Sequence, residues 1–171
     1  MMMFDPTYLL FAAPGLLLSL WASHRVRSAF SEYSQVGTVA GFSGAEAARH
    51  LLDDAGLHSV DIMETDGYLS DHYDPIQRRL ALSHDVYHGR SVAAVGVATH
   101  EAGHALQHSH GYAPLWLRSA LVPMANIGST AGYMVMAIGL FLHPFVVLLG
   151  AALFSLVLLF QVVTLPVEFD A

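Results

Sequence analysis

The sequence predicts a small α+β domain joined to three transmembrane helices, and three observations support this fold class. Hydrophobic residues make up 54% of the 171 residues, and the mean hydropathy is +0.49. Only 12% of the residues are charged, about half of the roughly 25% usual in a soluble domain. One polar segment mixes helical and alternating patterns, and three apolar stretches lie outside it. This composition excludes a disordered chain. We expect the apolar stretches to lie in a membrane and the polar segment to form one domain.

The first apolar stretch predicts a transmembrane helix at 4–22. Its uncharged run at 8–21 reaches only about 21 Å, so flanking residues are needed to cross a hydrocarbon core of roughly 30 Å. A signal peptide is the alternative, but Asp5 lies where such a peptide carries Lys or Arg. We therefore expect an anchor helix here.

The second and third stretches predict transmembrane helices at 119–142 and 145–165. Neither contains a charged residue, and each is long enough to span a bilayer. The short sequence between them, at 143–144, leaves room only for a tight hairpin. Gly128 and Gly132 form a GxxxG pattern, which favours close packing of two helices, although small residues are common in membrane helices in any case.

All seven Arg residues lie in the polar segment between the first and second apolar stretches. Arg25 and Arg27 follow the first stretch directly, and Arg118 adjoins the second. Positive residues near span ends collect on the cytoplasmic side of a membrane. We therefore expect a multi-pass protein of the cell membrane, with the lipid bilayer as a partner and the domain at 23–117 facing the cytoplasm.

Within this segment the patterns predict two helices and two short strands. Ser43 and Glu46 have the spacing of a capping box, which begins a helix that Gly56 ends. The later helix begins at Ser91. The expected elements cover 44–55 (helix), 60–63 (strand), 79–83 (strand) and 91–108 (helix).

The charge balance excludes several classes of partner. The net charge is −7, from 14 acidic residues against 7 basic ones, so no general affinity for nucleic acid is expected. The chain has no Lys and cannot form the phosphate-binding loop GxxxxGK[ST], so no nucleotide is expected either. It has no Cys, which excludes disulfides and thiolate metal ligands. The 11 His residues are the first indication of chemistry.

The later helix contains the pattern HExxH at 100–104. His100 and His104 lie one turn apart on the same face of a helix and can hold one zinc ion. Glu101 would lie beside the metal-bound water and act as general base. Histidines that are merely exposed are the alternative. However, the apolar run at 91–99 indicates a buried helix, where imidazoles without partners are costly.

A catalytic zinc ion needs a third protein ligand and one open position. His108 lies about 6 Å beyond His104 along the helix axis, too far to join the same ion easily. Two spans intervene between His104 and Glu168, so Glu168 returns to the side of the membrane where the histidines lie. The candidates for the third ligand are Asp71, His72, Asp74, Glu168 and Asp170.

In these residues the chain resembles the putative neutral zinc metallopeptidases, a family of small bacterial membrane proteins. The matching pieces lie at 26–34, 69–75, 82–87, 100–108 (HEAGHALQH), 121–126 and 165–171 (LPVEFDA). The resemblance implies a zincin-like fold, one Zn²⁺ ion, and a membrane-anchored endopeptidase that acts on protein or peptide substrates. Similarity to the wider gluzincin class points to Glu168 as the third ligand beside His100 and His104. It also implies that the strand at 79–83 borders the cleft and pairs with an extended substrate.

Family members usually continue for some tens of residues beyond this point, so we expect the chain to be a fragment. The segment at 166–171 would then begin a new helix, with Pro166 in its first turn and Glu168 as a ligand. Two alternatives remain: an intramembrane zinc protease with its HExxH helix in the bilayer, and a non-catalytic metal-binding membrane protein if the chain truly ends at Ala171. His84 and His88 are expected on a solvated edge. The natural substrate and the oligomeric state are not predicted.

Overall fold

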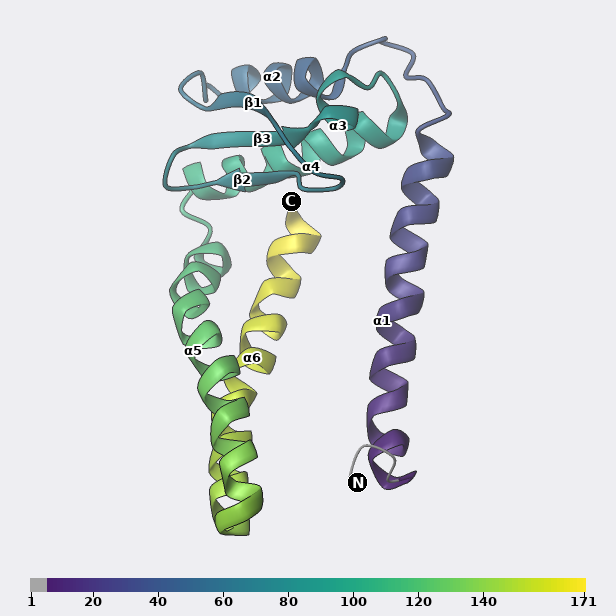
Figure 1. Ribbon diagram of the computed structural model, residues 1–171. Helices are drawn as coiled ribbons and strands as arrows, with labels where there is room; N and C mark the ends of the chain where they lie inside the picture. Colours follow the sequence, from purple (N-terminus) through teal and green to yellow (C-terminus); the bar gives the residue numbers. More distant parts are fainter. Residues whose placement is uncertain (1–5) are drawn as a thin grey trace.

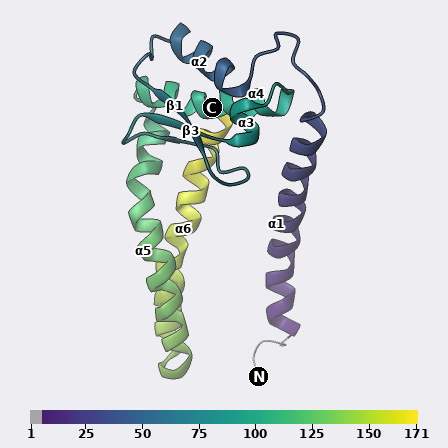
Figure 2. The same cartoon turned by 45° about the horizontal axis from the view of Figure 1, so that its top comes forward.

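A computed structural model describes residues 6–171, without the side chains at 6–9, 11 and 12. It contains a mixed domain of short helices and a three-stranded sheet, from which long helices extend in one direction (Figures 1 and 2). The predicted α+β class is therefore confirmed. The elements are α1 (Pro6–Tyr33), α2 (Gly44–Asp54), β1 (Asp61–Thr65), β2 (His72–Asp74), β3 (Arg79–Ser83), α3 (His84–His88), α4 (Val92–Ser109), α5 (Ala113–Leu142) and α6 (Pro144–Asp170).

The sheet has the order β1-β3-β2, so that β3 lies in the centre. β3 runs parallel to β1 and antiparallel to β2. Its Leu80 and Leu82 are fully buried, in one hydrophobic core with Ala48 and Leu52 of α2. The buried side chains that α4 contributes to this core are alanines (Ala98, Ala102 and Ala105), and such small residues let the helix lie close to its neighbours. The helix with HExxH thus packs into the core of the domain.

The predicted capping signals are confirmed. The Ser43 side chain accepts a hydrogen bond from the backbone N–H of Glu46, whose carboxylate in turn accepts one from the N–H of Ser43. Gly56 follows α2 with a positive φ of 73°, which favours glycine. Ser91 caps α4 by accepting from the N–H of Ala94. Local sequence therefore sets where both helices begin.

Among the residues that the structure describes, two helices have the length and composition needed to cross a membrane, α5 and α6. Both expose large apolar side chains, such as Phe141 and Leu158, as helices in contact with lipid do. The predicted number of three spans is thus corrected to two for these residues. The remaining prediction, 4–22, begins outside them. Its helix α1 continues past residue 22 through Arg25 and Arg27.

The three long helices α1, α5 and α6 all extend from the same side of the domain (Figure 1). The described start of α1 lies at the same end as the α5–α6 hairpin, and the domain lies at the other end (Figure 1). α5 and α6 pack closely because Gly132 and Gly150, which have no side chains, lie where the two backbones meet. A Cβ added at Gly132 would lie 2.7 Å from the backbone nitrogen of Phe154. The GxxxG pattern therefore serves helix packing.

The third apolar stretch continues further than the sequence predicts. α6 passes through Pro166 without a break and ends at Asp170, so the expected new helix at 166–171 is wrong. Glu168 instead lies in the last turn of a helix of 27 residues. A continuous helix needs no second nucleus, which is the costly step for a short helix. The loss of one backbone hydrogen bond at Pro166 is tolerated in this position.

Candidate metal centre

Two histidines of α4 and one glutamate of α6 converge beneath the sheet. The rings of His100 and His104 have their centroids 4.9 Å apart. One carboxylate oxygen of Glu168, Oε2, lies 3.3 Å from Nε2 of His100 and 3.5 Å from Nε2 of His104. One ligand atom from each of the three residues lies within 4.8 Å of the other two. The structure therefore brings together the three side chains that the sequence predicts as metal ligands.

These separations suit a metal ion better than hydrogen bonds. With bonds of about 2.0–2.1 Å, two ligands of a tetrahedral zinc ion lie about 3.3 Å from each other. The Glu168 oxygen lies at nearly this distance from both ring nitrogens, at 3.3 and 3.5 Å. A good N–H···O hydrogen bond is shorter, at about 2.9 Å. The donor set of two imidazoles and a carboxylate is also one that zinc prefers, so the residues present fit this ion.

A buried glutamine fixes the orientation of His104. The side-chain amide of Gln107 donates to the backbone oxygen of Val167 at 2.9 Å and to the carboxylate of Asp170 at 3.1 Å. Both partners can only accept, so the NH₂ group of Gln107 must face them. Its oxygen then accepts from Nδ1–H of His104, at 3.1 Å. This arrangement leaves the lone pair of Nε2 pointing at the candidate metal position.

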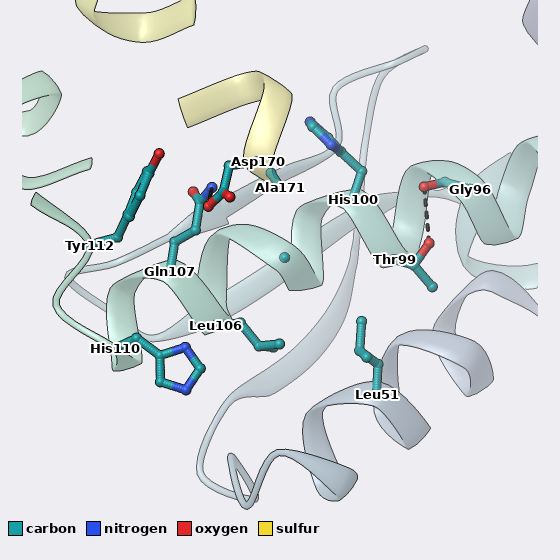
Figure 3. Close-up of a pocket in the computed structure, with 11 residues that line it drawn as sticks. Leu51, Gly96, Thr99, His100, Leu106, Gln107, His110, Tyr112, Asp170 and Ala171 are labelled. Carbon is teal, nitrogen blue, oxygen red and sulfur yellow. Dashed lines mark hydrogen bonds between the residues drawn. The ribbon is translucent and has the colours of Figure 1, made fainter. Parts of the chain in front are cut away.

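The same glutamine ties α4 to the end of α6. Figure 3 shows Gln107 and Asp170 meeting between the two helices, on the side of α4 that also carries His100. Gly103 permits this approach, because a Cβ there would lie 2.8 Å from the backbone carbon of Ala171. The small residue inside HExxH thus lets α6 present Glu168 to the histidines.

Glu101 is half-buried and lines the same cavity as His104 and Glu168. The pKa of Glu101 is raised from an ordinary value of 4.5 to about 7, and burial is the largest cause. The negative charges of Asp71 and Glu168 contribute to this rise, whereas a hydrogen bond from the Tyr73 backbone and the charge of Arg118 oppose it. Raised values of this kind suit a general base that works near neutral pH.

A cavity of about 250 Å³ connects Glu101 to the candidate ligands. His104 and Glu168 line it together with Glu101, and Arg118 contributes a positive charge to the same wall. Nη2 of Arg118 lies 4.0 Å from Oε1 of Glu168, the carboxylate oxygen that does not face the histidines. The cavity therefore joins the proposed base, the metal position and a cation that could bind a carbonyl or carboxylate oxygen.

The other acids proposed as third ligand have different partners. Asp71 accepts hydrogen bonds from the backbone N–H and the hydroxyl of Ser83. Asp74 accepts from the N–H groups of Ile76 and Gln77 and closes the turn after β2. Asp170 is bound to Gln107. Of these candidates, Glu168 alone shares a group with both histidines of HExxH among the residues that the structure describes.

The side chains of Tyr73 and His108 join β2 to α4. The hydroxyl of Tyr73 lies 2.9 Å from Nδ1 of His108, so the third histidine of HEAGHALQH holds the strand rather than the metal. His72 is exposed, and its Nδ1 lies 2.8 Å from the backbone oxygen of Ser70. Neither His108 nor His72 belongs to the group formed by His100, His104 and Glu168.

The expected role of the strand at 79–83 in substrate pairing is wrong. This strand is β3, and both of its sides are occupied, by β1 and by β2. The N–H of Ser83, which lies beyond the pairing with β2, is bonded to Asp71. The strand at the sheet edge beside the cavity is β2, since His72 and Tyr73 line that cavity.

Sequence reasoning missed Gln107 and Arg118. Gln107 lies three residues after His104, on the same helical face, and this spacing was the available signal. The contact of Gln107 with the backbone of α6 depends on tertiary packing and has no signal in local sequence. Arg118 is notable in the sequence only as a charge at the edge of a predicted span.

A HExxH helix joined by a carboxylate from a second helix defines a class of site, the two-histidine, one-carboxylate centre of zinc hydrolases. Comparison with known proteins agrees with this class. Residues 8–171 match the family described as putative neutral zinc metallopeptidase, and the chain belongs to this family. It is similar to the putative membrane protease YugP of Bacillus subtilis (strain 168), with 45% identity over 165 residues, which are 96% of this chain and 72% of the relative.

No solved structure matches the chain, so the zincin-like fold stays a prediction. The family description and the name of the relative support a zinc-dependent protease associated with a membrane. The two apolar helices α5 and α6 agree with that association.

Proposed function

We propose that this protein is a membrane-anchored zinc endopeptidase, with His100, His104 and Glu168 as ligands of one Zn²⁺ ion and Glu101 as the general base. One observation carries the proposal. A single oxygen of Glu168, from α6, lies 3.3 and 3.5 Å from the ring nitrogens of two histidines on α4. Family membership supplies the metal and the reaction class.

A zinc ion bound here would acidify a water molecule and polarise the carbonyl group of the substrate. Glu101 accepts the proton of the attacking water, whose oxygen bonds to the carbonyl carbon of the peptide. The same carboxyl group then passes the proton to the amide nitrogen as the C–N bond breaks. Burial raises the pKa of Glu101, which favours a carboxyl group that both accepts and returns a proton.

The substrate would lie as an extended peptide along β2. This strand is at an edge of the sheet and borders the cavity that contains Glu101. Backbone hydrogen bonds to a strand edge bind peptides with little dependence on their sequence. Arg118 faces the same cavity and would bind an oxygen of the peptide next to the cleaved bond.

The domain would face the cytoplasm beside the bilayer, in a multi-pass protein that crosses the membrane with α5 and α6. Arg25 and Arg27 lie in the second half of α1, and Arg118 lies near the start of α5. The domain lies at these ends of the two helices (Figure 1). This bias predicts the cytoplasmic side. The α4 helix packs in the core of the domain against α2 and the sheet, which argues against an intramembrane protease.

The experiment is a casein or peptide hydrolysis assay on the purified chain in detergent, with zinc analysis of the same samples. Wild type should hydrolyse the substrate, lose activity with a chelator and regain it with zinc. Glu101→Gln should retain zinc and lose at least 100-fold in rate, because general base catalysis contributes about that much. Zinc binding without chelator-sensitive hydrolysis in wild type would favour a non-catalytic metal-binding protein. Full activity in Glu101→Gln would exclude the mechanism.

A further inference from the structure

A second group of metal-binding side chains lies on the surface of the domain and shares no residue with the candidate metal centre. Glu64 belongs to β1, and His84 and His88 belong to α3. One ligand atom from each lies within 4.8 Å of the other two. Nδ1 of His84 lies 2.5 Å from Oε1 of Glu64, and Nε2 of His88 lies 3.2 Å from Oε2. Both imidazoles thus turn a nitrogen toward the same carboxylate.

The fold holds these three side chains in place without a long loop. Glu64 pairs with Leu82 in the parallel ladder of β1 and β3, and α3 begins at His84, two residues after Leu82. His84 and His88 lie one helical turn apart and share a face, with their ring centroids 4.9 Å apart. The carboxylate is therefore fixed by the sheet, and the two imidazoles by the helix that continues from that sheet.

We propose that Glu64, His84 and His88 form a second site for one divalent transition-metal ion, with Zn²⁺ as the best match. Two imidazoles and a carboxylate are ligands that zinc prefers, and three protein ligands leave one position for water. The short His84–Glu64 distance is that of a hydrogen bond, so the His84 ring must turn outward by about 1 Å to reach a tetrahedral arrangement. Its side chain is 73% exposed and has room to do so.

The exposure of these three side chains determines how tightly we expect them to bind zinc. The side chains of His88 and Glu64 are also open to solvent, at 55% and 44%. An exposed site competes with water for its ion and is ordered by few contacts, so it should bind zinc more weakly than the centre that contains the buried His104. A bound ion would join β1 to α3 and stabilise this corner of the domain.

An ordinary ion pair is the competing explanation, and the same chain offers a matched example. His58 lies 2.9 Å from the carboxylate of Asp53, also on the surface, with one imidazole instead of two. Removal of His58 should have no effect on metal binding, whereas removal of His88 should abolish the second site. The comparison separates a metal site from a pairing of charges.

The test uses the full chain in detergent with zinc chloride as the probe. Calorimetric titration of His100→Ala/His104→Ala, which lacks the candidate metal centre, should show one equivalent of bound zinc. Adding His88→Ala or Glu64→Ala to that protein should weaken binding at least tenfold, whereas adding His58→Ala should leave it within twofold. No saturable binding, or equal binding after His88→Ala, would overturn the proposal.

A second measurement applies if the double variant does not fold. In equilibrium dialysis against the same saturating zinc concentration, wild type should bind one equivalent more zinc per chain than His88→Ala. Equal zinc content in the two proteins would refute the second site. Because His88 lies outside the candidate metal centre, this result is independent of whether the proposed peptidase activity is found.

Discussion

Replacing Gln107 by Leu tests how the candidate metal centre is held together. Gln107 is 5% exposed and makes three hydrogen bonds, to His104, Val167 and Asp170. Leucine has a similar volume but can make none of them. Nδ1–H of His104 and the carbonyl of Val167 then lose their partners, and each such buried group costs about 1–3 kcal/mol.

The effect on metal binding follows from the orientation of one ring. Without its acceptor, His104 is free to rotate or to change tautomer, so Nε2 no longer points at the metal position. Loss of such an outer partner typically lowers metal affinity about 10–100-fold, which corresponds to about 1.4–2.8 kcal/mol. We therefore expect Gln107→Leu to bind zinc 10–100-fold more weakly than wild type.

The assay is competition for zinc with a chromophoric chelator, at constant pH and detergent concentration. Gln77→Leu is the matched control, because Gln77 is exposed and only its backbone N–H makes a hydrogen bond. This control should match wild type. If Gln107→Leu is less stable but binds zinc within twofold of wild type, the glutamine is merely structural and its assigned role in positioning His104 is wrong.

Three further predictions concern the base, the close approach of the helices and the ligand set. Between pH 4.5 and about 7, the folded zinc-free protein keeps the Glu101 proton, whereas the unfolded chain releases it. The unfolding free energy should therefore fall as pH rises through this window. The fall should exceed that of Glu101→Gln by up to about 3 kcal/mol in denaturant titrations, and parallel pH profiles would contradict the assignment. Gly132→Ala should lower the melting temperature, because the new Cβ would meet Phe154 at 2.7 Å, whereas Gly96→Ala meets nothing within 4 Å and should raise the unfolding free energy by about 1 kcal/mol. His104→Ala should lower the zinc content of the protein, and an unchanged content on metal analysis would count against the site.

Local signals predict those parts of the fold that local interactions determine. The Ser43–Glu46 capping box needs only residues within one turn, and the structure contains both of its hydrogen bonds. The alternating run at 79–83 becomes β3 with the same bounds, because its two leucines enter the core. α4 begins after Ser91, as predicted. In each case sequence pattern and tertiary packing favour the same structure.

Elements that depend on tertiary contacts could not be predicted. β2 has three residues and exists through its pairing with β3 and the bond between Tyr73 and His108. α3 has five residues, too few for a helical pattern to be visible. Pro166 wrongly suggested a new helix, because a proline marks a first turn more often than it interrupts a long helix.

In the candidate metal centre, too, some features follow from sequence spacing and others depend on tertiary packing. The pair His100 and His104 follows from helical spacing alone, and the return of Glu168 to their side follows from counting spans. The hydrogen bonds of Gln107 could not be foreseen, because they require the end of α6 to lie against Gly103. The raised pKa of Glu101 likewise depends on burial and on the nearby Asp71, which no spacing rule predicts.

The most direct test of the central claim is an anomalous difference map from crystals of the zinc-loaded protein, with data collected at the zinc absorption edge. The map should contain a strong peak bonded to Nε2 of His100, to Nε2 of His104 and to the carboxylate of Glu168. A well-ordered centre without such a peak, or a peak at the histidines with Glu168 turned away, would contradict the account.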